Sequence, residues 1–185
     1  MVEENNSKIL KYPETIKNLW IAFAGESQAR NKYDYFAKEF KKAGYEQIAA
    51  IFEETALNEK EHAKMIWKLL KENEKGLEGF LEAAIEGEHY ETNQMYPEFE
   101  KIAKEEGYAD AEKFFKEVGE VEEKHEARYK KLLEDLKEKK VFKENKEIKW
   151  KCRNCGYIHT GKEAPNECPC CKHPQAHFER LCENY

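Results

Sequence analysis

Two stretches, Glu59-Lys60-Glu61-His62 and Glu122-Glu123-Lys124-His125, decide the fold of this chain. Each places a glutamate and a histidine three residues apart, so both side chains fall on one face of a helix. That face is otherwise mostly apolar, with Ile48, Phe52, Thr55, Ile66 and Leu69 around the first stretch and Val118, Val121, Tyr129, Leu132 and Leu136 around the second. Desolvating an unpaired carboxylate costs several kcal/mol or more, so we expect a cation among these groups.

The same apolar spacing predicts four long helices, over residues 12–43, 45–74, 77–107 and 109–139. Gly44, Gly76 and Gly107 stand where these helices are expected to end, since glycine readily adopts the left-handed conformation that follows a helix. Long helices with short connections favour an antiparallel bundle. The sequence therefore predicts a mostly α protein built on a four-helix bundle.

An internal repeat relates the first two helices to the last two. Gly44 and Tyr45 recur 63 positions on as Gly107 and Tyr108, and Glu59 and His62 recur as Glu122 and His125. The counterpart of Glu26 is Glu88, only 62 positions on, so one residue has been gained before Tyr96. We predict that a π-bulge within residues 88–97 absorbs the extra residue.

The repeat defines a candidate binding site for two metal ions. Glu26 and Glu88 lie on the inward stripes of the first and third helices, and each of the other two helices carries a Glu-x-x-His pair. This is how four-helix bundles hold paired metal ions. The predicted ligands are Glu26, Glu59, His62, Glu88, Glu122 and His125. Their positions on apolar stripes argue against ordinary solvated surface residues.

Glu91 adds a fifth carboxylate, because it follows Glu88 by three residues on the same face. Five carboxylates supply about −5, against roughly +4 for a diferrous pair and +6 for a diferric pair. We therefore expect Glu91 to bind only the oxidised metal and neutral His62 to take its place on the reduced metal. The alternative is that Glu91 is exposed or lies beside the ligands without binding the metal.

Two tyrosines and one further histidine lie near these ligands in the sequence. Tyr33 and Tyr96 stand about two turns beyond Glu26 and Glu88, where their hydroxyls would hydrogen-bond ligand carboxylates. Alternatively, both are core aromatics. His89 points away from the inward stripe, and we expect it to be a solvated helix residue.

A cysteine-rich module follows the helices. All six cysteines lie between Cys152 and Cys182, and two Cys-x-x-Cys motifs are separated by twelve residues. Their spacing predicts one tetrahedral metal, either iron or zinc, held by four thiolates. The predicted ligands are Cys152, Cys155, Cys168 and Cys171. Cys170 is a competing ligand that the spacing disfavours, and Cys182 is expected to be a free thiol.

Two domains are expected, a bundle over residues 1–145 and a metal module over 146–185. Residues 137–149 are charged and weakly patterned, which predicts a linker long enough for the module to dock on a neighbouring subunit. The net charge is −6, and no basic patch with interleaved aromatics suggests nucleic acid binding. No apolar run is long enough to span a bilayer, and no signal sequence is evident, so a cytoplasmic location is expected.

The chain resembles the rubrerythrin family. The resemblance rests on residues 24–33, 59–62, 87–91, 95–97 and 122–125 and on the two cysteine motifs. It implies a ferritin-like bundle with a non-haem di-iron site that reduces hydrogen peroxide to water, followed by a rubredoxin-like Fe(Cys)4 module. It further implies electrons from an NAD(P)H-dependent rubredoxin reductase or similar donor, and a cytoplasmic homodimer or larger assembly. The exchange between Glu91 and His62 is also the exchange that the family uses.

Other functions fit parts of the same sequence. An oxygen reductase or a ferroxidase would use the same di-iron ligands, and a ferritin-like iron-binding protein would use the same bundle. The fused cysteine module argues against iron storage, which needs no electron relay. A zinc ribbon that binds a protein partner is the third alternative, and zinc can also replace iron in recombinant protein, since similar ligands accept both metals.

Overall fold

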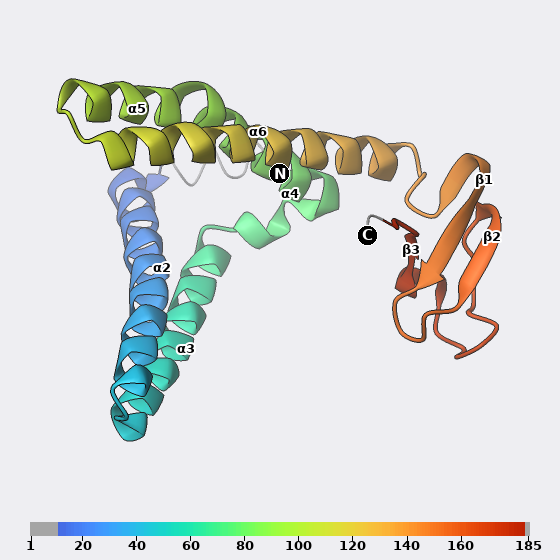
Figure 1. Cartoon of the computed structure of the whole chain (residues 1–185), viewed down its shortest axis with the longest axis horizontal. Helices are drawn as coiled ribbons and strands as arrows, with labels where there is room; N and C mark the ends of the chain where they lie inside the picture. Colours follow the sequence, from blue (N-terminus) through green and yellow to red (C-terminus); the bar gives the residue numbers. More distant parts are fainter. Residues whose placement is uncertain (1–10, 184–185) are drawn as a thin grey trace. The chain divides into compact units, whose positions relative to one another are not determined.

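The computed structural model describes residues 11–183, and the chain divides after Gly76 into two compact units (Figure 1). The expectation of no signal sequence concerns a stretch that lies mostly outside the described residues. The predicted fold class is confirmed, since the chain is mostly helical and ends in a small three-stranded module that carries the cysteines. None of the described helices is long and apolar enough to cross a membrane.

The first unit is a helical hairpin of α2 (Pro13–Lys42) and α3 (Glu46–Leu69), which lie side by side (Figure 1). A short 3₁₀ turn, η1 (Glu72–Glu74), follows. The buried residues of the two helices are alanines: Ala37 on α2 and Ala49, Ala56 and Ala63 on α3. Side chains this small let the two helix backbones approach closely.

The stripe that the sequence predicted to be buried lies beside this alanine seam. Phe52 and Glu59 are half-buried, whereas Ile48 and Leu69 are exposed. A hairpin gives each helix only one neighbour, and the alanines already occupy that contact. The prediction of a fully buried stripe is therefore wrong for the hairpin taken by itself, although the carboxylates do lie along it.

The second unit begins with another hairpin. Its first arm is α4 (Gly76–Tyr90), the π-helix η2 (Glu91–Met95) and α5 (Tyr96–Glu105), and its second arm is α6 (Ala109–Lys137). The backbone N–H of Tyr96 donates to the carbonyl of Glu91, five residues earlier, as a π-helix requires. The predicted π-bulge is thus confirmed at the place where the repeat gains its extra residue.

The two hairpins repeat each other in detail. Gly44 and Gly107 both adopt positive φ, at 83° and 76°. The amides of the following tyrosines donate back to the helix just ended, Tyr45 N to Phe40 O at 2.9 Å and Tyr108 N to Ala103 O at 2.8 Å. Matching aromatic clusters stand behind these turns: Tyr33, Phe36, Phe40 and Phe52 in the first hairpin, and Tyr96, Phe99 and Phe115 in the second.

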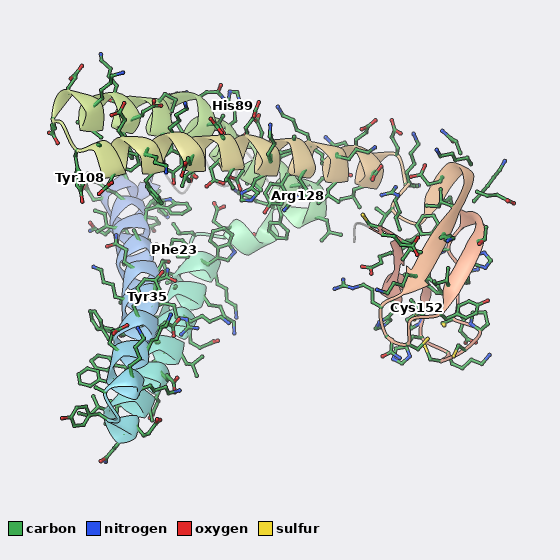
Figure 2. The ribbon with its side chains drawn as sticks, in the orientation of Figure 1. Phe23, Tyr35, His89, Tyr108, Arg128 and Cys152 are labelled. Carbon is green, nitrogen blue, oxygen red and sulfur yellow. The ribbon has the colours of Figure 1, made fainter. Side chains whose placement is uncertain are left out.

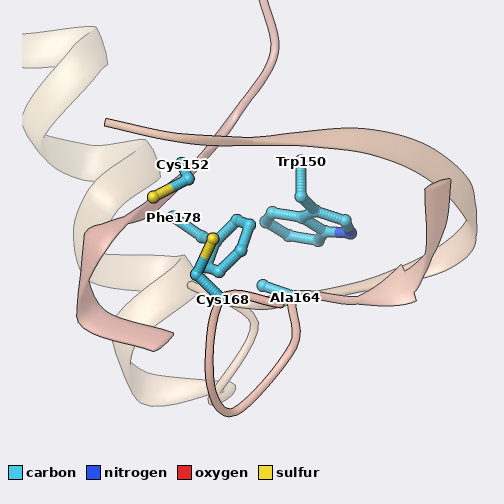
Figure 3. Packing of buried hydrophobic residues seen from close by; sticks show 5 residues of the cluster. All are labelled: Trp150, Cys152, Ala164, Cys168 and Phe178. Carbon is cyan, nitrogen blue, oxygen red and sulfur yellow. The ribbon is translucent and has the colours of Figure 1, made fainter. Parts of the chain in front are cut away.

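The C-terminal module is an antiparallel sheet in the order β2-β1-β3, formed by β1 (Lys143–Cys152), β2 (Ile158–Glu163) and β3 (Phe178–Arg180). A 3₁₀ turn, η3 (Gln175–His177), precedes β3. Figure 3 shows its core, in which Trp150 packs with Cys152, Ala164, Cys168 and Phe178. The Trp150 indole N–H donates to the carbonyl of Gly161 at 3.0 Å, so this buried polar group is satisfied.

The linker predicted over residues 137–149 is mostly a strand. Helix α6 continues to Lys137 and β1 begins at Lys143, so the connection is residues 138–142 and the expected domain boundary at 145/146 falls inside β1. In the second half of β1, the apolar residues Ile148, Trp150 and Cys152 alternate with exposed or half-buried lysines. Most residues in the first half of the strand are charged and exposed. The start of the strand therefore carries no apolar signal in the sequence.

Candidate metal centres

The first hairpin gathers three of the predicted ligands. Glu26 comes from α2, and Glu59 and His62 come from one face of α3. His62 Nδ1 lies 2.8 Å from Glu59 Oε2 and 3.6 Å from Glu26 Oε2. Each residue offers one ligand atom within 4.8 Å of the other two, so the three side chains converge on one point.

The second hairpin repeats this arrangement with Glu88 of α4 and Glu122 and His125 of α6. His125 Nδ1 lies 2.6 Å from Glu122 Oε2 and 3.8 Å from Glu88 Oε2. The ligand atoms again lie within 4.8 Å of one another. The repeat in sequence has therefore produced two triads of the same composition and nearly the same geometry.

The carboxylates of each triad disfavour each other's ionisation. The pKa of Glu26 is raised, first by its hydrogen bond with Glu59 and then by burial. Burial and a hydrogen bond with Glu122 raise the pKa of Glu88. A hydrogen bond with Glu59 raises the pKa of His62. A divalent ion placed between these groups would relieve the repulsion.

Glu91 lies at the start of η2, close enough to the second triad to interact with it electrostatically. Burial, followed by the charge of Glu122, raises its pKa. The pKa of Tyr96 is raised by burial and by the charges of Glu91, Glu122 and Glu88. Both side chains thus belong to the surroundings of the second triad, although Glu91 is not one of its three converging ligands.

The tyrosine hydroxyls do not make the expected hydrogen bonds. Within residues 11–183, neither Tyr33 nor Tyr96 donates to a ligand carboxylate. The Tyr33 ring instead packs on Phe52 and Phe36, with centroid distances of 5.8 and 6.1 Å. In this structure Tyr33 therefore has the contacts of a core aromatic, while Tyr96 combines ring packing on Phe115 with proximity to three carboxylates.

His89 is a residue whose environment the sequence did not reveal. Its side chain, labelled in Figure 2, is exposed, as expected, but its Nδ1 lies 2.9 Å from Oε1 of the buried Glu126 on α6. Lys130 also pairs with Glu126, at 2.6 Å, and these contacts lower the pKa of Glu126. The contact between His89 and Glu126 links α4, which carries Glu88, to α6, which carries His125. Among the described residues, the first hairpin has no such contact, because the repeat places Ala63 at the position of Glu126.

Four cysteines of the C-terminal module form a second kind of centre, which we call the four-cysteine cluster. The sulfurs of Cys152, Cys155, Cys168 and Cys171 all lie within 4.8 Å of one another, with Cys152–Cys171 and Cys155–Cys168 each at 3.7 Å. A tetrahedral site with metal–sulfur bonds of about 2.3 Å places its sulfurs about 3.8 Å apart. The four thiolates therefore fit a single tetrahedral metal.

The two cysteine motifs share one backbone design. Cys152 N donates to Tyr157 O and Cys168 N to His173 O, both at 2.8 Å. Gly156 and Lys172, each following the second cysteine of its motif, both adopt positive φ, at 79° and 62°. This turn aims the amides of Tyr157 and His173 at sulfur, and the His173 amide, as the largest influence, lowers the pKa of Cys171 to about 6.

The two remaining cysteines stay outside the sulfur cluster. Cys170 and Cys182 are both exposed and unbridged. Cys170 is next to Cys171 in sequence, but only the latter belongs to the group of converging sulfurs.

Comparison with known proteins explains why two carboxylate–histidine triads and a four-cysteine cluster occur in one chain. A family model described as Rubrerythrin matches residues 17–133, and one described as Rubrerythrin, rubredoxin-like domain, matches residues 150–179. The chain belongs to the rubrerythrin family. The first match contains all seven carboxylate and histidine ligands that were predicted, and the second contains the four cysteines.

Relatives from several bacteria match almost the whole chain. Rubrerythrin of Nitratidesulfovibrio vulgaris is 45% identical over 190 residues, which cover 96% of this chain and 100% of that protein. Rubrerythrin of Porphyromonas gingivalis is 45% identical, covering 97% of this chain and 96% of its own. Rubrerythrin of Clostridium perfringens is 43% identical, covering 96% and 100%.

The donor sets of this rubrerythrin suit iron. Carboxylates and imidazoles in the two triads are ligands for iron in oxygen-handling sites, and four thiolates in a tetrahedron are the ligands of rubredoxin-type iron. The predicted cofactors, two iron ions held by carboxylates and histidines and one held by cysteines, therefore fit the residues present. Zinc would fit the same thiolates.

Proposed function

We propose that this rubrerythrin is a non-haem di-iron peroxidase that reduces hydrogen peroxide to water and protects against oxidative stress. The observation that carries the proposal is the presence, in one chain, of two matching carboxylate–histidine triads and a tetrahedral four-cysteine cluster. The triads have the ligands of a two-electron site, and the four-cysteine cluster has those of a one-electron relay. A storage protein would need no such relay.

In the reduced state, Glu26, Glu59 and His62 would hold one iron ion, and Glu88, Glu122 and His125 would hold the other. The sequence repeat and the family membership support the assignment of both triads to one di-iron centre in the helical part of the chain, which is followed by the four-cysteine module. When bound, the ferrous pair supplies the two electrons that break the O–O bond as hydrogen peroxide takes up two protons and becomes two waters.

Glu91 and His62 would adjust the ligand set to the oxidation state. Glu91 is half-buried beside Glu122, and its pKa is raised first by burial, so an extra positive charge nearby would favour its ionised form. His62 is exposed and hydrogen-bonded to Glu59, which leaves its side chain room to move. We propose that Glu91 binds in the oxidised state and His62 replaces it in the reduced state.

Tyr96 would act as a neutral hydrogen-bond donor beside the second triad. Burial and the charges of Glu91, Glu122 and Glu88 raise the pKa of its hydroxyl, so it keeps its proton at neutral pH. A neutral donor near several carboxylates can orient them and can share a proton with the departing oxygen. Tyr33 would have the same role beside the first triad. Its ring packs on Phe52, as the ring of Tyr96 packs on Phe115 in the second hairpin.

The four-cysteine module would receive electrons from an NAD(P)H-dependent rubredoxin reductase or a similar donor. Cys155, a member of the four-cysteine cluster, and Cys170 are both exposed, so a donor protein could approach the predicted metal site from solvent. We further propose that the protein acts in the cytoplasm as a homodimer or larger assembly, in keeping with the resemblance to rubrerythrin.

The test is anaerobic stopped-flow spectroscopy of the fully reduced, iron-loaded protein, mixed separately with hydrogen peroxide and with oxygen. The signal is the visible band of the ferric four-thiolate centre. Rapid reoxidation by peroxide, with oxygen much slower, is expected. Equal or faster oxidation by oxygen would replace the proposal with an oxygen reductase, and no reoxidation by either would exclude both activities. A variant with Glu26→Gln and Glu88→Gln, which leaves the four cysteine ligands intact, is the control for direct oxidation of the module.

A further inference from the structure

Several backbone hydrogen bonds hold the connection between α6 and the four-cysteine module. Helix α6 closes with Lys139 N donating to Leu136 O at 3.1 Å and Lys140 N to Asp135 O at 2.7 Å, while Lys139 adopts a left-handed φ of 55°. These are the bonds of a Schellman motif. Lys143 N then donates to Lys140 O at 3.1 Å. The connection is therefore a defined turn, in contrast to a solvated tether.

The same connection is packed onto the module. Phe142 lies against the core around Trp150, and its carbonyl accepts a hydrogen bond from Ala164 N at 2.9 Å. Directly after β3, Leu181 N donates to Lys149 O at 2.8 Å, which holds the chain there against β1. The module thus has an ordered surface at the end of α6.

One arginine joins the parts of this joint. Arg180 Nη1 donates to Asp135 Oδ2 on α6 at 2.8 Å, Nε donates to Glu144 Oε1 on β1 at 2.8 Å, and Nη2 donates to the carbonyl of Lys140 in the turn at 2.9 Å. A planar guanidinium can make these three bonds at once, whereas a lysine ammonium on its flexible stem cannot reproduce the fork.

The charge at the centre of the joint is buried. Asp135 is 2% exposed, and its other oxygen accepts from Lys131 at 3.1 Å. Burial acts to raise the pKa of Asp135, but the bonds from Lys131 and Arg180 outweigh it and the pKa is lowered. Breaking a buried pair by removing one partner is costly, because it leaves a charge without compensation. Arg180 is thus the residue on which the joint depends.

We propose that Arg180 is a positioning residue, locking the four-cysteine module to the end of α6 through Asp135, Glu144 and the Lys140 carbonyl. The consequence for electron transfer rests on the proposed function: the module delivers electrons from one fixed orientation. This contrasts with the swinging module that a long linker would allow. Electron transfer then depends on the joint as well as on the two metal centres.

The first test measures motion and needs no peroxide. Backbone ¹⁵N relaxation of the full-length, zinc-loaded protein reports the rotational correlation times of α6 and of the module. The wild type should show one shared value, and Arg180→Gln should give the module a shorter one. Arg153→Gln is the matched control, since Arg153 is an exposed arginine of the same module that pairs with Glu179. Independent tumbling in the wild type, or an unchanged module in Arg180→Gln, would overturn the proposal.

The second test measures electron transfer. In the reduced, iron-loaded protein, Arg180→Gln should slow the peroxide-driven return of the ferric thiolate band by roughly tenfold, which is within the loss of up to about a hundredfold that a small misplacement of reacting groups causes. The band itself should not shift, because Arg180 does not contact the sulfurs. Arg180→Lys should restore only part of the rate. A wild-type protein inert to peroxide would refute the proposed function, while the relaxation data would still decide the joint. Equal rates in Arg180→Gln and the wild type would contradict the positioning role.

Discussion

At the scale of single residues, the ligand carboxylates are held together against their own repulsion. Glu26 with Glu59, and Glu88 with Glu122, share hydrogen bonds that raise the pKa of one member of each pair. A pair of carboxylates in such contact favours a shared proton or a cation. At neutral pH, repulsion in the metal-free site therefore lowers the free energy of unfolding, and metal binding raises it again. Such a trade between stability and function is common at functional sites.

This cost predicts the pH dependence of the metal-free protein. The folded-state pKa of Glu88 is raised above 4.5 and that of His62 above 6.5. Groups with raised folded pKa values stabilise the fold at low pH, and that stability is lost as the pH rises through the folded pKa. Chemical denaturation of the metal-free helices should therefore give a larger free energy of unfolding near pH 5 than at pH 7.5.

The iron-loaded protein should show the opposite trend, since iron binds the deprotonated ligands and is released by acid. Glu88→Gln is the matched variant: at pH 7.5 it should stabilise the metal-free protein by about 1 kcal/mol and weaken iron binding. A metal-free wild type that becomes more stable between pH 5 and 7.5 would show that repulsion within the triads is not the dominant electrostatic effect.

At the scale of elements, the repeat made the helices predictable. Glycines at equivalent positions, Gly44 and Gly107, end equivalent helices, and the break in register between Glu88 and Tyr96 located the π-helix from the sequence alone. The start of β1 and the pairing of His89 with Glu126 were not predictable in this way. Charged residues in a charge-rich chain carry no periodic signal, and their partners are selected by tertiary packing.

The π-helix predicts a specific effect of a deletion. Removing Gln94, an exposed residue of η2, should convert the segment to a regular α-helix. Glu88 would then rotate by roughly 100° relative to α5 and α6, because one residue is that fraction of a helical turn. The second triad should lose its convergence, and the iron content of the carboxylate sites, measured by elemental analysis and corrected for the cysteine-bound iron, should fall by about half.

Thr92→Ala is the control for this deletion. The Thr92 hydroxyl is the buried side-chain polar atom that lacks a hydrogen-bond partner among the described residues, so removing it should leave stability and iron content nearly unchanged. A Gln94 deletion that binds iron as well as the wild type does would show that Glu88 reaches the triad without the π-helix.

At the scale of the whole molecule, the helices and the four-cysteine module are stabilised in different ways. The first helical hairpin is long and buries an alanine seam, whereas the four-cysteine module has a core of five buried residues, of which two are predicted metal ligands. A core this small rarely holds a fold without a metal or a disulfide. The joint at Arg180 adds ion pairs to this module. Arg180 and Asp135 are 45 positions apart, and no sequence periodicity could predict a contact over that separation.

Metal removal should therefore unfold the module before the helices. Treating the full-length protein with a chelator at neutral pH should strip the four-cysteine site and release the strands, while far-UV circular dichroism shows that helical content persists. The three tryptophans distinguish the regions, because Trp150 lies in the module core while Trp20 and Trp67 lie on α2 and α3. The Trp150 indole N–H resonance, shifted by its bond to Gly161, should move to the position of an exposed indole. A Trp150 resonance unchanged after complete metal loss would mean that the five-residue core and the Arg180 joint suffice to hold the module folded.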